Sequence, residues 1–417
     1  MLGRDAASGR TGVDRPNPGV PLWNLTAAEP LTAPTLLPGL RRGTSFYEVA
    51  FSSDGRWLVT GGDDETPRLW DLKNPAARPR AFAGHSGVVA AVAVSPDNHW
   101  LVTGSFDGQV RVWDLGNSDP AAHPTIVGDR DTQIFTVEIS RDSRWLLSRG
   151  KNNSRLWDLR ATPPKAIQLG QSDHMAFSPD SHWLVVATYM NARLWNLKEP
   201  SAPPRELQGG APVAFSPESH WLVTSSAAVK RGGYSGTDVR LWDLRSAELK
   251  PTPFPGSQHL RDFVFSPNER WLVVNSYDGT TFDEAVRVWD LTDLTAAPRT
   301  LGSESIRVVG ISPDNHWMIS VGKDGRPAHL WRLTATDITA VPIALPALPF
   351  DGFLFSPDNR WMVSRGKGNI GLWNMRLDEL RDLACRTAGR NLSEEEWKTY
   401  FRGQPYRRTC DDMPARQ

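Results

Sequence analysis

The sequence predicts an all-β fold built from eight repeats, each of which forms a small antiparallel sheet. Three observations lead to this prediction. The chain of 417 residues contains 18 Trp, and all but Trp397 fall into one recurring pattern. Within the pattern, short apolar runs are bounded by turn residues, as β-strands are. The second Trp of the pattern returns every 38 to 47 residues, which is the period of a unit that buries its apolar faces by stacking on its neighbours.

The repeat is clearest in residues 92–115, VAVSPDNHWLVTGSFDGQVRVWDL. An apolar strand leads to a Ser-Pro-Asp turn, in which Pro fixes φ and Asp closes the turn locally. A Trp-Leu-Val strand, a Gly/Asp turn and an Arg-Val-Trp-Asp-Leu strand follow, and a fourth strand fits in the linkers, as in residues 77–84 and 296–302. Related segments lie at 49–72, 137–159, 175–197, 213–244, 263–291, 309–333 and 353–375.

Each of these eight units contains two tryptophans. The first are Trp57, Trp100, Trp145, Trp183, Trp221, Trp271, Trp317 and Trp361. The second are Trp70, Trp113, Trp157, Trp195, Trp242, Trp289, Trp331 and Trp373. We expect nearly all of them to belong to the core, because large side chains between stacked sheets are buried.

The two-Trp unit with its Trp-Asp ending resembles the repeats of the WD40 family, over about residues 20–376. The resemblance implies a WD40-type β-propeller of four-stranded blades, eight in our first choice and seven in the alternative. WD40 blades often share a hydrogen-bonded set of His, Ser or Thr, Asp and Trp. Only the second unit contains all four members, which are His85, Thr103, Asp107 and Trp113.

We divide the chain into a disordered segment at 1–20, the propeller at 21–376 and a helical cap at 377–417. Residues 34–40 are expected to close the last blade as its fourth strand, which removes an open sheet edge. Residues 21–25, PLWNL, would compete with residues 370–375 for one place. They therefore lie outside the ring, or the chain is the end of a longer protein.

The C-terminal tail reads as two short helices, at about 379–388 and after Ser393, where Glu396 completes a capping box. The tail packs on the last blade or forms a partner surface. It resembles the end of WD40 sensor regions in bacterial multidomain signalling proteins, which carry NTPase, protease or TIR domains. The tail contains both cysteines, Cys385 and Cys410. Two free thiols and a bridge are both compatible with their number, and free thiols are favoured in a cytoplasm.

Composition argues against several functional classes. Lys plus Arg and Asp plus Glu both number 47, so no bulk field attracts nucleic acid or an anionic membrane. The sequence contains no apolar run of membrane-helix length and no signal peptide. It also lacks a nucleophile elbow, a phosphate-binding loop and a zinc motif. We expect a cytoplasmic, non-enzymatic protein with no cofactor, catalytic or metal-binding residues, and with neither nucleic acid nor membrane as its partner.

The irregular units indicate where a partner binds. The two Trp of a unit are 12 to 14 residues apart in six units, but 21 apart in unit 5 and 18 apart in unit 6. Because the units are neighbours, both insertions should project from the same face. The candidate contact residues are Lys230, Arg231, Tyr234, Tyr277, Phe282, Asp283 and Glu284. We predict a protein-protein interaction scaffold or sensor in a bacterial signalling or defence complex. The alternative is a ligand-binding or catalytic propeller that uses its central channel.

Overall fold

A computed structural model gives the fold of the chain. It describes residues 20–22, 35–37, 46–128, 133–151, 153–188, 190–230, 233–246, 248–254, 260–277, 284–301, 306–322, 327–333, 342–345, 350–366, 369–375, 391, 393–396, 406, 408 and 410. The chain divides into two compact units. Unit 1 contains Met1–Thr188 and Arg193–Arg205, and unit 2 contains Tyr189–Ala192 and Glu206–Gln417.

Unit 1 contains three four-stranded antiparallel sheets and most of a fourth, with the strands of each sheet in sequence order. Sheet 1 consists of β3 (Phe46–Phe51), β4 (Trp57–Gly62), β5 (Arg68–Asp71) and β6 (Arg80–Ala81). Sheet 2 consists of β7 (Val89–Val94), β8 (Trp100–Ser105), β9 (Val110–Asp114) and β10 (Thr125–Val127). Sheet 3 consists of β11 (Ile134–Ile139), β12 (Trp145–Gly150), β13 (Ser154–Asp158) and β14 (Lys165–Gly170). Sheet 4 consists of β15 (His174–Phe177), β16 (Trp183–Ala187), β17 (Asn191–Asn196) and β18 (Arg205–Gln208).

Unit 2 contains the remaining four sheets. Sheet 5 consists of β19 (Gly210–Phe215), β20 (Trp221–Lys230), β21 (Gly233–Asp243) and β22 (Pro251–Phe254). Sheet 6 consists of β23 (Leu260–Phe265), β24 (Trp271–Tyr277), β25 (Glu284–Asp290) and β26 (Arg299–Leu301). Sheet 7 consists of β27 (Ile306–Ile311), β28 (Trp317–Gly322), β29 (His329–Arg332) and β30 (Ile343–Ala344). Sheet 8 has three described strands, β31 (Phe350–Phe355), β32 (Trp361–Gly366) and β33 (Asn369–Asn374).

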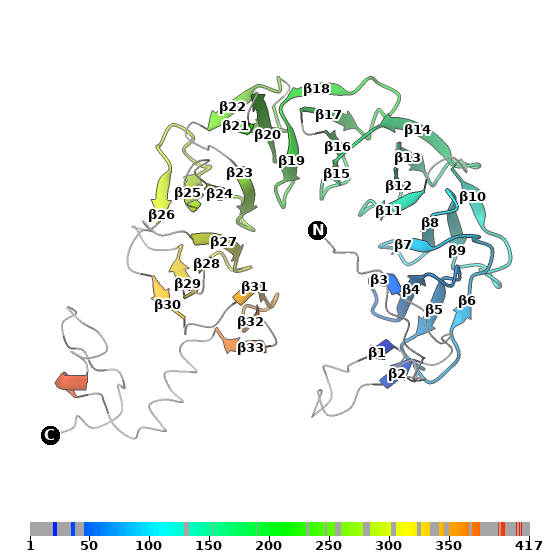
Figure 1. Ribbon diagram of the computed structural model, residues 1–417, viewed down its shortest axis with the longest axis horizontal. Helices are drawn as coiled ribbons and strands as arrows, with labels where there is room; N and C mark the ends of the chain where they lie inside the picture. Colours follow the sequence, from blue (N-terminus) through cyan, green and yellow to red (C-terminus); the bar gives the residue numbers. More distant parts are fainter. Residues whose placement is uncertain are drawn as a thin grey trace, which may run out of the picture. The chain divides into compact units, whose positions relative to one another are not determined.

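The eight sheets coincide with the eight repeats of the sequence. In every sheet the first Trp begins the second strand, and the second Trp lies near the end of the third strand. Within unit 1, the first strands β3, β7, β11 and β15 lie along one side and the fourth strands along the other (Figure 1). The linker strands expected in residues 77–84 and 296–302 are β6 and β26.

A ninth, two-stranded sheet lies at the N-terminal end of the described residues. β1 (Val20–Leu22) pairs with β2 (Thr35–Leu37) in antiparallel register. Leu37 is buried against Leu58 and Trp70 of sheet 1. The partner of residues 35–37 in the structure is therefore β1. The expectation that residues 34–40 close the last repeat stays a prediction.

The core consists of apolar layers between successive sheets. Between sheets 1 and 2, Val59 and Leu69 pack with Val89, Leu101 and Trp113, all of them buried. Equivalent layers follow between sheets 2 and 3, 3 and 4, 5 and 6, 6 and 7, and 7 and 8. Since each strand presents apolar residues to both neighbouring sheets, a single sheet cannot bury its own surface and the stack stabilises every member.

The Ser-Pro-Asp turns do more than reverse the chain. In sheet 2 the buried Ser95 hydroxyl donates to Asp97 and accepts from the backbone N–H of Trp100. In seven of the eight turns, the residue after the Asp or its equivalent is not glycine and yet adopts a positive φ, as Asn98 does at 60°. Its side chain accepts a hydrogen bond from a backbone N–H in the preceding sheet of the same unit. The donor and acceptor pairs are Ser53–Asn98, Asp97–Ser143, Asp142–Ser181, Glu218–Glu269, Asn268–Asn315 and Asp314–Asn359.

The described part of the tail contains the expected capping box. Residues 394–396 are helical. The backbone N–H of Ser393 donates to the Glu396 carboxylate at 2.8 Å, and the Ser393 hydroxyl accepts from the backbone N–H of Glu396 at 3.2 Å. The earlier helix expected at 379–388 and the side chain of Trp397 lie outside the described residues.

Cys410 corrects one expectation. We favoured free thiols, but Cys410 is disulfide-bonded. Its surroundings hold it in place, because Cys410 is buried and the Asn391 side chain accepts from its backbone N–H at 2.8 Å and donates to its carbonyl at 3.0 Å. Cys385 lies outside the described residues.

Candidate functional site

The largest departure from the repeat is the hairpin formed by β20 and β21. These strands have ten and eleven residues, whereas the second and third strands of every other sheet have four to seven. Register pairs extend along the hairpin to Val229↔Tyr234 and Lys230↔Gly233, with an irregularity between Ala227 and Val229. The insertion that we expected as a loop is thus mostly a continuation of two strands.

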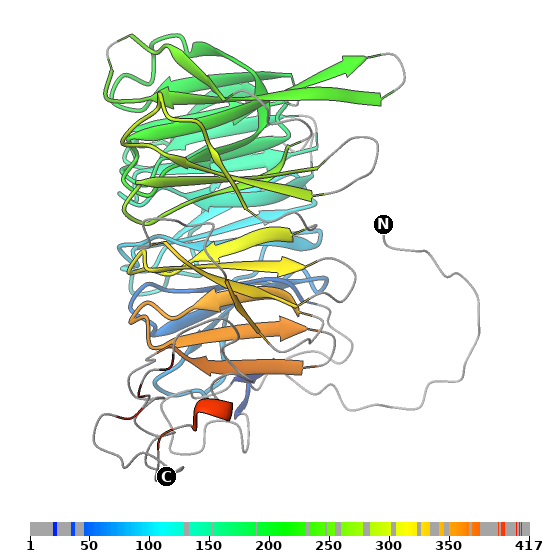
Figure 2. The same cartoon turned by 90° about the vertical axis from the view of Figure 1, so that its left-hand side faces the viewer.

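The outer part of this hairpin has only two strands. β19 pairs with β20 as far as Ser225, and β22 pairs with β21 as far as Val239. Residues 226–230 and 233–238 therefore have no third strand beside them in the described part of the chain. A two-stranded ribbon is marginally stable on its own and exposes hydrogen-bonding edges on both sides. Figure 2 shows the green hairpin extending past the other strands of unit 2.

The insertion in the sixth repeat lengthens the strands of sheet 6 less than the insertion in the fifth repeat lengthens those of sheet 5. β24 and β25 have seven residues each, and their last register pair is Tyr277↔Glu284. They extend in the same direction as β20 and β21 (Figure 2). Of the seven candidate contact residues, four lie in these strands, namely Lys230, Tyr234, Tyr277 and Glu284. The other three, Arg231, Phe282 and Asp283, lie outside the described residues.

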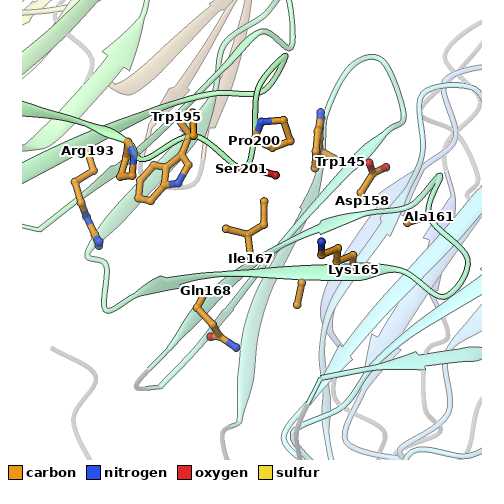
Figure 3. Close-up of a pocket in the computed structure, with 13 residues that line it drawn as sticks. Trp145, Asp158, Ala161, Lys165, Ile167, Gln168, Arg193, Trp195, Pro200 and Ser201 are labelled. Atoms are coloured by element: carbon orange, nitrogen blue, oxygen red, sulfur yellow. The ribbon is translucent and has the colours of Figure 1, made fainter.

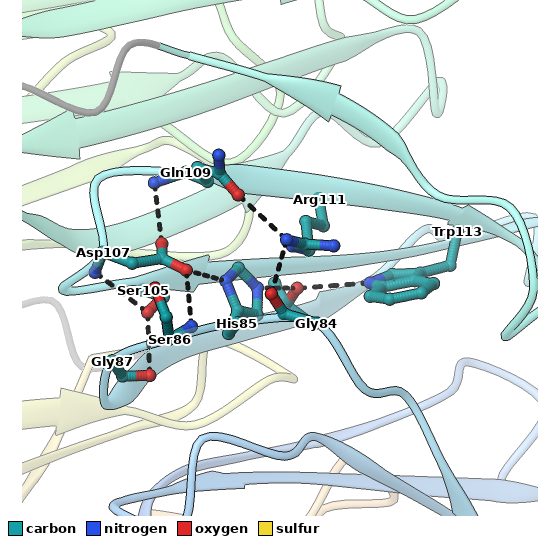
Figure 4. A network of polar contacts seen from close by, with 10 residues as sticks. Gly84, His85, Ser86, Gly87, Ser105, Asp107, Gln109, Arg111 and Trp113 are labelled. Atoms are coloured by element: carbon teal, nitrogen blue, oxygen red, sulfur yellow. Dashed lines mark hydrogen bonds and ion pairs between the residues drawn. The ribbon is translucent and has the colours of Figure 1, made fainter.

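The structure brings together the four residues of the hydrogen-bonded set in sheet 2 (Figure 4). His85 Nδ1 lies 2.9 Å from Asp107 Oδ2, and His85 Nε2 lies 2.8 Å from the Thr103 hydroxyl. The Thr103 hydroxyl also accepts from Trp113 Nε1 at 3.2 Å. Because a carboxylate only accepts, Nδ1 of His85 donates to Asp107 and Nε2 accepts from Thr103.

This arrangement describes a neutral imidazole. Burial lowers the pKa of His85, and the hydrogen bond to Asp107 opposes that effect only in part. Burial acts to raise the pKa of Asp107, but hydrogen bonds from the backbone of Gln109 and Ser86 and from His85 outweigh it, so that this pKa is lowered. The set is a buried polar network in the middle of a sheet, and its geometry is that of a structural element.

The position before the first Trp has a structural role as well. Either His or Arg occupies this position in each repeat. Arg144 stacks on Trp145, with its guanidinium carbon 4.5 Å from the ring centroid, and pairs with Asp158 at 2.9 Å. Arg56 and Arg270 make the corresponding contacts with Asp71 and Asp290. The Asp of the Trp-Asp ending therefore bonds back to the residue in front of the first Trp.

A recess lies on the first-strand side of unit 1, between sheets 3 and 4. Its volume is about 330 Å³, and it is lined among others by Glu138, Arg149 and His174. Glu138 is exposed at the mouth of the recess, but protein atoms around it still displace water and raise its pKa. Burial lowers the pKa of His174, and the charge of Arg149 adds to that shift. Shifted groups that converge in a recess are a recognised sign of functional sites.

Sequence reasoning did not identify this recess. Glu138 and Arg149 belong to one repeat and His174 to the next, and nothing in a single repeat shows that their side chains meet. One signal was available in the sequence. Glu138 occupies a strand position that is Ala in repeats 1, 2, 4 and 5, namely Ala50, Ala93, Ala176 and Ala214.

No helix in the described residues is long and apolar enough to cross a membrane. No group of three or more His, Cys, Asp or Glu in the same residues is placed to hold a metal ion. The expectation of a chain without cofactor, catalytic or metal-binding residues stays a prediction.

Comparison with known proteins identifies the repeat. The family model described as "WD domain, G-beta repeat" matches residues 42–71 and 78–114, which cover most of sheets 1 and 2. Residues 42–71 and 78–114 are WD40 repeats. A curated relative, Protein LST8 homolog of Drosophila pseudoobscura pseudoobscura, is 30% identical over 139 residues, or 33% of this chain and 42% of the relative. The chain thus spans less than half the length of that relative.

One solved structure supports the fold, and a second superimposes less closely. A eukaryotic initiation factor superimposes with a TM-score of 0.55 at 16% identity, over 78% of this chain and 81% of that chain. Sqt1 from Chaetomium thermophilum gives a TM-score of 0.48 at 17% identity, over 79% and 96% of the two chains. The all-β, WD40-type propeller fold predicted from the repeats is confirmed. The number of blades stays a prediction.

Proposed function

We propose that this WD40-repeat protein is a protein-interaction scaffold whose docking face is formed by the β20–β21 hairpin and the end of the β24–β25 pair. WD40-repeat proteins generally serve as protein-interaction scaffolds. The bacterial signalling or defence context belongs to the same proposal and rests on the resemblance of the C-terminal tail.

The observation that carries the proposal is the unsupported outer part of the hairpin. Residues 226–230 and 233–238 are paired only with each other within the described chain. A partner strand or loop that lies against them would satisfy the edge groups that such a ribbon leaves open. The hairpin contains Lys230 and Tyr234, and β24 and β25 contain Tyr277 and Glu284. Tyr is a favoured residue type for anchors in interfaces.

The test is affinity purification with matched variants. The bait is the intact protein. It is compared with a variant in which residues 226–237 and 278–284 are shortened to the length of the equivalent turn in the second repeat. A control replaces residues 117–119 in the β9–β10 turn with Gly and Ser, and circular dichroism verifies that all three baits fold. We expect a partner that binds the intact and control baits and is lost from the shortened one. A partner retained by all three would contradict the proposed face.

The recess at Glu138, Arg149 and His174 supports a second candidate function. Glu138 and His174 on the first strands β11 and β15 converge with Arg149 on the second strand β12. A ligand-binding or catalytic site would require such a convergence of an acid, a basic residue and a His. Glu138→Gln and His174→Ala variants, compared with the parent protein in a thermal-shift screen of small metabolites, test it. A ligand that stabilises the parent and neither variant would favour this candidate over the scaffold.

A further inference from the structure

A groove lies on the fourth-strand side of unit 1, between sheets 3 and 4. Its volume is about 540 Å³. One wall is β14, and the other is formed by β17 and the segment that leads from it to β18. Figure 3 shows Ile167, Gln168 and Lys165 on β14 opposite Arg193, Trp195 and Pro200. The groove belongs to unit 1 alone, whereas the face proposed above belongs to unit 2.

The strand that forms the first wall is unusual for its position. Among the described fourth strands, β14 has six residues, and the others have two to four. It is the last strand in the order β11-β12-β13-β14, so its outer edge has no strand partner in the described part of the chain. A long edge strand of this kind is a template for a further strand from another chain. Extended peptides bind to many proteins by adding to such an edge.

The side chains of the groove select for an apolar group. Ile167 in the middle of β14 faces a surface that includes Trp195, Pro200 and Pro204. Ile167 is half-buried, so it remains available for contact. In an added strand, alternate side chains point to the same face. One such side chain of Val or Leu size would lie between Ile167 and Trp195.

The charge of the groove is positive. Lys165 is exposed, and the described residues offer it no ion pair. Arg193 donates to the carbonyl of Leu169 at 2.6 Å and stacks on Trp195 at 5.1 Å, which fixes its position without neutralising its charge. The one acidic residue in the lining, Asp158, is bonded to Arg144 at 2.9 Å. A ligand carboxylate is therefore the complementary group for Lys165.

We propose that this groove binds an extended, acidic segment of a partner protein, which adds to the outer edge of β14 as a fifth strand of sheet 3. The segment seats an apolar side chain between Ile167 and Trp195 and places a carboxylate beside Lys165. Because Lys165 and Ile167 are two residues apart and lie on the same face of β14, the segment that the groove recognises carries an acidic and an apolar residue two positions apart, so that both enter from one face of the added strand.

The probe is a fluorescein-labelled peptide of eight residues, Val-Ser-Glu-Ser-Val-Ser-Glu-Ser, with both ends blocked, in which Val and Glu follow one another on the same face of the strand. Fluorescence polarisation measures its affinity for the full chain. A peptide with Lys in place of Glu tests the charge, and a Val/Glu peptide methylated on alternate backbone nitrogens tests the strand hydrogen bonds. We expect the Val/Glu peptide to bind with a Kd below about 1 mM, and both altered peptides to bind at least about tenfold more weakly.

Matched variants locate the binding site. Lys165→Glu and Lys165→Gln should weaken binding of the Val/Glu peptide by about tenfold, as expected for loss of a charge-assisted contact. Lys198→Glu makes the same charge change on an exposed residue of the neighbouring turn that does not line the groove, and should leave affinity within about threefold. Ser201→Trp should block binding by filling the groove. Hydrogen exchange should show slower exchange of backbone amides in β14 on peptide binding.

Three results would overturn the proposal. No binding at about 1 mM would exclude an acidic peptide of this kind. Equal losses in Lys165→Glu and Lys198→Glu would reduce the effect to bulk charge. Equal affinity for the methylated peptide would show that the ligand binds without joining the sheet, as a small acidic molecule would.

Discussion

The backbone N–H of Ser53 in sheet 1 donates a hydrogen bond of 3.0 Å to Oδ1 of Asn98 in sheet 2. The Ser53 hydroxyl contacts the same oxygen at 3.1 Å. Asn98 can make this contact because it adopts a left-handed φ of 60°, which Asn tolerates better than most residues. In sheet 1 the same turn position is Gly55, at a φ of 66°, which has no side chain to reach a preceding sheet. The contact therefore links each sheet to the one before it in the same unit, except at sheet 1.

Replacing Asn98 with Gly should lower the free energy of unfolding by about 1 kcal/mol, because the turn conformation is kept and the acceptor is lost. Urea denaturation measures the change. Glu65→Gly is the control, since Glu65 has a φ of 62° and no hydrogen bond from its side chain is found among the described residues. We expect this control to be as stable as the parent or more so. Equal destabilisation by both substitutions would show that the inter-sheet bond contributes nothing.

His85 should be the most sensitive histidine of the chain. Its side chain is fully buried and bonds both Thr103 and Asp107. His85→Ala leaves buried polar groups without a partner, and we expect it to cost about 2 kcal/mol. His182→Ala removes an exposed pair with Asp180 and should cost less than about 0.5 kcal/mol. Similar losses in the two variants, measured by urea unfolding, would contradict a structural role for the sheet 2 network.

The same network makes stability depend on pH. The pKa of His85 is lower in the folded protein than its ordinary value of 6.5, chiefly because of burial. Its contribution to stability is therefore complete above pH 6.5 and is lost as the pH falls through the folded pKa. We expect the stability difference between the parent and His85→Gln to shrink between pH 7.5 and pH 5. A difference that stays constant over this range would show that His85 does not titrate differently in the two states.

Glu138 should act in the opposite direction. Burial raises its pKa above the ordinary 4.5, so its favourable contribution is present below pH 4.5 and is lost as the pH rises through the folded pKa. Glu138→Gln should then be more stable than the parent at pH 7 and equal to it near pH 4, by thermal unfolding. Glu206→Gln, at an exposed position on β18, is the control and should show no such crossover. A destabilised Glu138→Gln at pH 7 would mean that the carboxylate is held by a favourable contact.

The sequence predicted those features that repeat. Eight two-Trp units, the order of strands and the members of the His85 set could all be derived, because the same residues recur at a fixed spacing. Features that depend on a neighbouring repeat could not. The Ser53–Asn98 bond joins residues 45 apart, and a Ser-Pro-Asp turn by itself shows only its local bonds. The groove beside β14 likewise forms only where the fourth strand of one repeat meets Arg193 and Trp195 of the next.

The conformation of the insertion in the fifth repeat could not be predicted from the sequence either. Its position between the second and third strands was clear from the Trp spacing of 21 residues. Its conformation was not, since Gly, Ser and Lys in residues 225–239 favour a loop. Pairing in the structure extends to Lys230↔Gly233, past a register shift between Ala227 and Val229.

Site-specific photo-crosslinking tests the docking face most directly. A benzophenone amino acid is placed at Tyr234, near the tip of the β20–β21 hairpin, and in a control at Ser246, just beyond the other end of β21. Both proteins are expressed in the native cell and irradiated, and adducts are identified by mass spectrometry. The scaffold account predicts a discrete adduct from position 234 that is absent at position 246. Adducts from position 246 alone, or none from position 234, would contradict the claim that this hairpin contacts a partner.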